Sequence, residues 1–176
     1  MEYMEKMQLK EILSQSIHAY DIKLLKKTAD KEDIFAFMFD KDKKTSDNAA
    51  WVMTHLPKSY NKWLDTKRDV LINGVLSAKE TTQLRLFLNL LERLEYREDN
   101  LRTDFLDFCL ANCVSPMQPA GIQSLCMKLA YKQCILYEEL LKELKSTMQI
   151  IPPNELSAGT RCQYNKILRK INAVKY

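Results

Sequence analysis

The amino-acid sequence predicts an all-α protein, folded as a right-handed α-α superhelix (a solenoid) of about four antiparallel helix pairs. Three observations predict it. Stretches that begin near Asp47, Thr81, Ala120 and Ala158 look like copies of one helix. Only three glycines occur in 176 residues, so tight β-turns are scarce. No segment alternates apolar and polar residues for long enough to make a convincing strand.

The helix copies recur at a nearly constant spacing. The third and fourth copies align without a gap, which pairs Cys126 with Tyr164, and a looser alignment puts Trp51 and Leu86 at the same position. The steps between these positions are 35, 40 and 38 residues. Helical repeats with periods of about 34 to 47 residues are helix pairs that stack side by side.

The chain is therefore predicted to form one domain, 1–176, with N-terminal capping helices in 1–30 and helix-pair repeats in 31–176. Residues 4–28 have the apolar pattern of one or two amphipathic helices, and Asp21 is a plausible start for the second.

Capping residues predict the next helices. Asp30 is placed to cap a short helix, and Ser46 to cap a helix over 48–56 that ends before Pro57. The charged stretch 41–44 between them is predicted to be a solvated turn. The short helix and the residues after it carry an aromatic run that we expect to cover the end of the stack, because it is too apolar to face water: Phe35, Phe37 and Phe39.

The middle of the chain continues in the same way. Ser59 is a candidate cap for one helix that extends through Val75, and Ser77 with Glu80 has the spacing of a capping box. The helix that follows has apolar residues at the spacing of a buried stripe. They are Leu84, Phe87, Leu88 and Leu91.

The second half holds three more predicted helices and the last copy. We expect helices over 99–114, from Pro119 onwards and over 138–148, and Ser157 as the cap of the final helix. The final helix should turn one face inward, with Tyr164, Ile167, Leu168 and Ile171.

Composition limits the compartment and the partners. The net charge of +4 is too small to require nucleic acid. An odd number of irregularly spaced cysteines favours reduced thiols and a cytoplasmic location: Cys109, Cys113, Cys126, Cys134 and Cys162. No apolar stretch approaches the ~20 residues of a membrane span, and the N-terminus does not have the pattern of a signal peptide.

Motifs for catalysis and cofactors are missing from the sequence. Cys109 and Cys113 are four apart and could meet one metal ion, but no further ligand pair stands nearby, so both are expected to be small buried residues. His55 is expected near a helix C-terminus, and His18 has no catalytic neighbour. No nucleophile elbow, phosphate loop or dinucleotide fingerprint occurs. We therefore expect no catalytic residue, no metal and no cofactor.

The aromatic and basic residues are candidates for binding a nucleic acid or a peptide. Trp51 and Trp63 could stack on a base or grip a peptide, although the repeat alignment places Trp51 in the core. From Ser157 onwards the chain has no acid, and Lys166, Arg169 and Lys170 share one face of the last helix. That face could contact phosphates or could simply be solvated.

The repeat pattern resembles the HEAT/armadillo class of helical repeats, and within it a group of small bacterial HEAT-like proteins. The resembling segments are 48–52, 122–129, 157–161 and 166–168, and the resemblance covers residues from about 31 to the end. Proteins similar to these sometimes carry the label adenylosuccinate lyase. The serine loop of that enzyme reads roughly Ser-Ser-x-Met-Pro-x-Lys-x-Asn-Pro, and the nearest segment here, 115–119, lacks the lysine and the asparagine.

Three functions follow as hypotheses. The first is a non-enzymatic interaction or scaffold module that binds a protein or peptide through the inner faces of the second helices, near Asn48, Gln83, Gln123 and Arg161. The second is a nucleic-acid-binding HEAT protein of the alkylation-repair type. The third is a small enzyme that deserves the lyase label.

Overall fold

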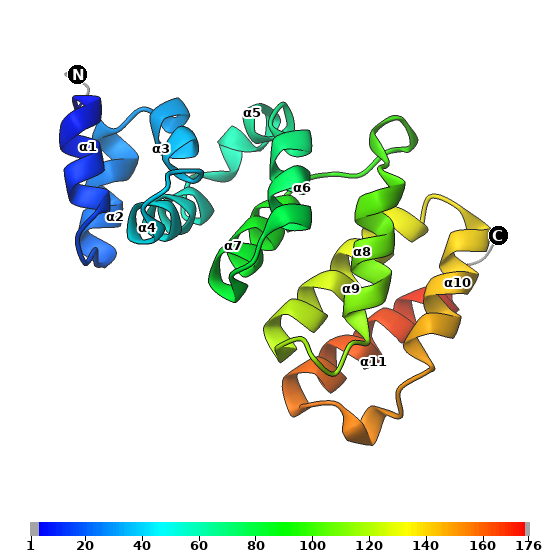
Figure 1. The fold of residues 1–176 in the computed structure, drawn as a ribbon. Helices are drawn as coiled ribbons and strands as arrows, with labels where there is room; N and C mark the ends of the chain where they lie inside the picture. Colours follow the sequence, from blue (N-terminus) through cyan, green and yellow to red (C-terminus); the bar gives the residue numbers. More distant parts are fainter. Residues whose placement is uncertain (1–3, 175–176) are drawn as a thin grey trace. The chain divides into compact units, whose positions relative to one another are not determined.

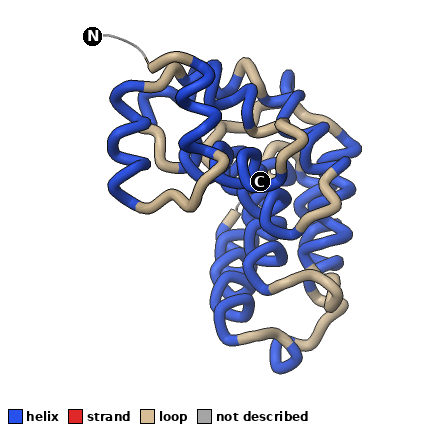
Figure 2. The backbone as a smooth tube through the Cα atoms, turned by 60° about the vertical axis from the view of Figure 1, so that its left-hand side comes forward, coloured by secondary structure: helices blue, strands red, loops and turns tan. Residues whose placement is uncertain are grey.

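The computed structural model describes residues 4–174, and in this part of the chain the predicted all-α fold is confirmed. Figure 1 shows successive helices, and Figure 2 shows that loops join them and that the described residues contain no strand. The chain forms two compact units, unit 1 (Met1–Leu90) and unit 2 (Leu91–Tyr176). The single domain over 1–176 and the right hand of the superhelix stay predictions.

Unit 1 consists of short helices, and its first three helices pack on α4. α3 packs against α4, and both α1 and α2 pack on α4. α7 runs two residues past the end of the unit. The bounds are α1 (Lys6–Leu13), α2 (Ala19–Thr28), α3 (Lys31–Phe37), α4 (Lys43–Thr54), α5 (Asn61–Asp65), α6 (Arg68–Ser77) and α7 (Thr81–Glu92), with a 3-10 turn at Lys58–Tyr60.

Local hydrogen bonds decide where these helices begin. Asp30 caps α3 as predicted, because its carboxylate accepts the backbone N–H of Glu32 at 2.7 Å. The predicted cap at Ser46 is wrong. Asp42 caps α4 instead, accepting from the backbone N–H and the hydroxyl of Thr45 at 2.8 and 2.6 Å. The helix therefore starts inside the predicted turn 41–44, and Ser46 is buried in its second turn.

Two further start positions differ from the prediction. α2 begins after His18, not at Asp21, because the Asp21 carboxylate accepts the backbone N–H of His18 at 2.8 Å and so stabilises the earlier start. Ser77 does not open a capping box. It is the last residue of α6, where its hydroxyl donates to the Asn73 carbonyl at 2.7 Å.

The helix predicted from Ser59 to Val75 is interrupted. α5 ends at Asp65, and α6 begins three residues later. At the break the Thr66 hydroxyl donates to the Trp63 carbonyl at 2.7 Å, and a Ser or Thr hydroxyl that bonds the backbone in this way competes with helix continuation. The buried Arg68 side chain pairs with Asp65 across the break.

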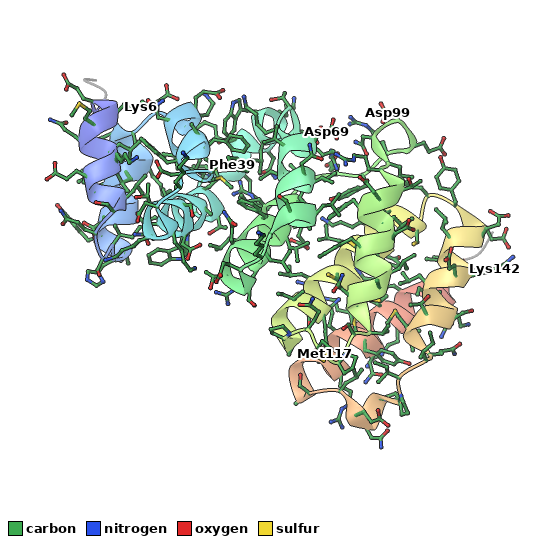
Figure 3. The ribbon with its side chains drawn as sticks, viewed as in Figure 1. Lys6, Phe39, Asp69, Asp99, Met117 and Lys142 are labelled. Atoms are coloured by element: carbon green, nitrogen blue, oxygen red, sulfur yellow. The ribbon has the colours of Figure 1, made fainter. Side chains whose placement is uncertain are left out.

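A glycine allows the close approach of α6 and α7. A Cβ on Gly74 would lie 2.6 and 2.8 Å from ring carbons of Phe87, which is fully buried. Phe39, which follows α3 and is labelled in Figure 3, stacks on Phe87 with 5.5 Å between ring centroids. The predicted buried stripe of α7 is confirmed.

Unit 2 is organised around α9, which packs against α8, α10 and α11. The helices are α8 (Thr103–Cys113), α9 (Ala120–Cys134), α10 (Glu138–Met148) and α11 (Ala158–Ala173), with 3-10 turns at Glu98–Asn100 and Pro153–Glu155. The bounds of α10 and the cap at Ser157 match the predictions.

Two details of unit 2 differ from the sequence analysis. α8 starts at Thr103, not near residue 99, because a 3-10 turn occupies the residues before it. On α11 the predicted inward residues Tyr164, Ile167 and Ile171 are buried, whereas Leu168 is half-buried because it lies at the edge of that face.

We predict that Gly74→Ala destabilises the protein by about 1–3 kcal/mol, because the added methyl group overlaps the ring of Phe87, which is fully buried. This loss exceeds the gain of up to about 1 kcal/mol that alanine brings inside a helix. Urea unfolding followed by circular dichroism measures the change.

Gly159→Ala on α11 is the matched control, because nothing lies within 4 Å of its added Cβ. Its stability should be unchanged or slightly raised. Equal unfolding midpoints for the two variants would contradict the packing described for α6 and α7.

Candidate interaction surfaces

The four residues predicted to line a groove occupy one position of the repeat. Each stands three residues before its aligned position: Asn48 before Trp51, Gln83 before Leu86, Gln123 before Cys126 and Arg161 before Tyr164. In the structure all four side chains donate to backbone carbonyls of nearby turns. The position therefore holds a side chain with an N–H donor in every repeat, and binding by these residues stays a prediction.

In unit 1 these donors join helices to the turns that precede them in sequence. The Asn48 amide donates to the carbonyls of Leu13 and Gln15, both at 2.8 Å, at the C-terminal end of α1. The Gln83 amide donates at 3.3 Å to the carbonyl of Met38, the C-cap of α3. Carbonyls at helix C-termini have no partner within the helix, so such donors satisfy them.

In unit 2 the corresponding donors brace two loops. The buried Gln123 amide donates at 2.7 Å to the carbonyl of Ser115, just after α8. The Arg161 guanidinium donates at 3.1 Å to the carbonyl of Leu156, just before α11. Gln123 and Arg161 thus fix the two loops that lie at this end of α9 and α11.

These two loops enclose a pocket with a volume of about 490 Å³. Its lining is mostly apolar, and Glu155 is the one ionisable residue among the described lining residues. The lining residues are Val114, Pro116, Gln118, Ala120, Gln123, Ile150, Ile151, Glu155, Leu156 and Ser157. Pockets of this size and composition hold small ligands or side chains of a partner.

Two large apolar side chains stand in solvent on the pocket loops. Ile150 lines the pocket and is 71% exposed, and Met117, at the tip of the loop between α8 and α9, is 88% exposed (Figure 3). Exposed apolar side chains beside an apolar pocket are typical of protein interaction sites. No sequence pattern predicted this pocket, although Ser115-Pro116 and Pro152-Pro153 marked both loops.

The predicted basic face of α11 is exposed to solvent. Lys166, Arg169 and Lys170 are all exposed, and neither Lys166 nor Arg169 makes an ion pair within the described residues. The Lys170 ammonium lies 5.3 Å from the centroid of the Tyr131 ring on α9, a cation–π contact. The three side chains therefore present positive charge on one helix.

Comparison with known families identifies the type of helical repeat in this chain. A family model described as HEAT repeat domain matches residues 5–171. The chain belongs to the HEAT repeat family. Neither the search of curated proteins nor the search of solved structures found a match.

In this HEAT repeat protein the two tryptophans are half-buried. Trp51 is not the core residue that the repeat alignment predicted, because it lies at the edge of α4 with its ring against that of His55, 5.6 Å between centroids. His55 is the C-cap of α4, as expected, and its Nδ1 contacts the Trp51 carbonyl at 2.9 Å.

Trp63 belongs to a cluster of residues that no sequence pattern predicted. We call it the Trp63 patch and define it by Lys31, Glu32, Phe35, Tyr60, Trp63 and Lys67. Its members come from α3, α5 and the turns beside α5, and the Phe35 and Trp63 rings meet edge to face at 5.8 Å between centroids. The separation of 31 residues between Glu32 and Trp63 gave no local signal for this contact.

Three of the four buried cysteines of this HEAT protein have raised pKa values. Burial raises the pKa of Cys113 and of Cys134 to about 12, and raises that of Cys109 well above its usual value. These thiols are therefore protonated at neutral pH and cannot act as nucleophiles. Within residues 4–174, no cluster of three or more His, Cys, Asp or Glu residues has the geometry to hold a metal ion.

We predict that a disulfide reagent such as dithionitrobenzoate modifies one thiol of the folded chain quickly. Cys162 on α11 is exposed, whereas the other four cysteines are buried. All five should react once the protein is unfolded in denaturant. Absorbance of the released thiolate gives both counts, and Cys162→Ser is the control that should abolish the fast phase. Fast reaction of several thiols in the folded protein would contradict the burial described here.

Proposed function

We propose that this HEAT repeat protein is a non-enzymatic interaction module that binds a segment of a protein partner in the apolar pocket of unit 2. The observation that carries the proposal is the pocket of about 490 Å³ with the exposed side chains of Ile150 and Met117 on its loops. An apolar side chain of the partner would fill the pocket, and Ile150 would gain contacts that it lacks in the free protein.

The chemistry of the pocket supports binding over catalysis. General acid–base or nucleophilic catalysis needs a reactive group with a second group that activates it. The lining contributes one carboxylate, that of Glu155, and the hydroxyl of Ser157 is already bonded to that of Thr160 at 2.9 Å. HEAT repeats commonly mediate protein interactions, which agrees with this proposal.

The compartment proposed for this interaction is the cytoplasm. All five cysteines are free thiols, and reduced thiols are typical of that compartment. No helix in the described part of the chain combines the length and the apolar character required to span a bilayer.

We predict that peptides selected from a phage-displayed library on the purified protein bind the pocket of unit 2. Ile150→Asp should weaken the selected peptides about tenfold or more, because it places a charge at an apolar rim without disturbing the core. Isothermal titration calorimetry measures the affinities. Met7→Asp is the matched control, since Met7 is 84% exposed and lies in unit 1. Failure to select any peptide, or equal affinity of the selected peptides for the Ile150→Asp and Met7→Asp variants, would contradict the proposal.

A second candidate function is nucleic-acid binding, and the basic face of α11 favours it. The described part of α11 carries Arg161, Lys166, Arg169 and Lys170 without any acidic residue. Cations on one face contact phosphates with an affinity that falls steeply with salt.

For this candidate, short duplex DNA should bind at low salt and dissociate at high salt. Replacing Lys166 and Arg169 by glutamine should reduce the slope of log affinity against log salt by about 2, because each phosphate contact releases about one counterion. Replacing Lys26 and Lys27, two exposed lysines of α2, removes the same charge and is the control. Fluorescence anisotropy provides the affinities, and absence of binding at low salt would eliminate the candidate.

A further inference from the structure

The Trp63 patch of unit 1 holds two lysines in fixed positions over aromatic rings. The Lys31 ammonium lies 5.3 Å from the centroid of Trp63 and 5.8 Å from that of Tyr60. The Lys67 ammonium lies 5.8 Å from the centroid of Trp63 and 5.7 Å from that of Phe35. Flexible lysine side chains are costly to immobilise on binding, and here the rings have already restricted them.

The carboxylate within the patch is fully engaged. Glu32 accepts the indole N–H of Trp63 at 2.5 Å, and its other oxygen pairs with the Lys67 ammonium at 3.0 Å. These two bonds, that from Trp63 first, lower the pKa of Glu32, so the carboxylate stays ionised. Lys31 makes no ion pair within the described residues, so the patch keeps one positive charge in excess of its one carboxylate.

The surroundings add positive charge and apolar surface. Lys58 and Lys62, on the turn before α5 and on α5, are both exposed. Asp65 of the same helix is paired with Arg68 and does not offset them. Phe39 is 42% exposed beside Phe35, and Tyr60 is 37% exposed. The patch therefore combines unbalanced cations with exposed aromatic surface.

These features select among possible ligands. A nucleobase that stacked on Trp63 would have to displace an ammonium from the ring, whereas a carboxylate binds the ammonium where it already lies. The exposed rings of Phe39 and Tyr60 suit an apolar side chain, which a phosphate backbone does not offer. An acidic peptide with an apolar residue supplies both groups.

We propose that the Trp63 patch is a docking site for an acidic peptide segment, whose carboxylates bind the ammonium groups of Lys31 and Lys67 while an apolar side chain packs on Tyr60 and Phe39. This site deepens the proposed interaction role but uses another surface than the pocket of unit 2. Its interactions are charge-dependent, so its affinity falls with ionic strength.

The experiment uses a fluorescein-labelled peptide of glutamate and aspartate residues with a single leucine. Fluorescence anisotropy at low salt should show saturable binding to the full-length protein. Replacing Lys31 and Lys67 by glutamine should weaken binding about tenfold or more, and Lys31→Gln alone should weaken it several-fold. The single variant breaks no ion pair, so it keeps the test valid if loss of the Lys67–Glu32 pair alters α3 or α5.

The matched control replaces Lys26 and Lys27 by glutamine, which removes equal charge from α2 in the same unit and should leave binding unchanged. Ile150→Asp should also bind the probe normally, which separates this site from the pocket of unit 2. A peptide with serine in place of leucine should bind more weakly. Absence of peptide binding would overturn the proposal, and so would an equal loss of affinity in the Lys26 and Lys27 control variant. A single-stranded DNA of equal charge that bound more tightly than the peptide and displaced it would also overturn the proposal.

Discussion

Each short helix of this chain ends in backbone carbonyls that the helix itself cannot satisfy, and the repeat depends on meeting that need from outside. The side chain three residues before the aligned position supplies such a donor in three repeats, from Asn48, Gln83 and Gln123, whereas Arg161 braces the loop before its own helix. A buried carbonyl without a partner costs about 1–3 kcal/mol, so the donor type at this position is a physical requirement of stacking short helices.

Both candidate surfaces include residues of the turns between helices. Gln123 and Arg161 brace two proline-containing loops, and these loops line the apolar pocket of unit 2. Where α5 ends early at Asp65, Trp63 stays at the surface against α3 and gathers the lysines of its patch.

Much of the fold was predictable because helix pairing leaves a periodic apolar pattern in the sequence. The stripe of α7, the bounds of α10 and the caps at Asp30 and Ser157 followed from local spacing alone. Ser46 and Ser77 were wrongly predicted as caps because a serine hydroxyl can either cap a helix N-terminus or donate to a carbonyl inside a helix. Tertiary structure decides between these two roles. The Trp63 patch joins residues more than thirty positions apart, and no local pattern reports such contacts.

Helix α9 is enclosed on three sides, by α8, α10 and α11, and its core positions carry side chains such as Cys126 and Cys134 that are inaccessible to solvent. A fluctuation that frees the backbone of α9 has to separate all three interfaces at once. Amide protons in the middle of α9 are therefore expected to be released only when unit 2 opens, whereas the ends of the helices can fray on their own. The helix whose N-terminus borders the pocket is thus the one that packs against all three other α-helices of unit 2, so a ligand in the pocket would contact the start of the central helix.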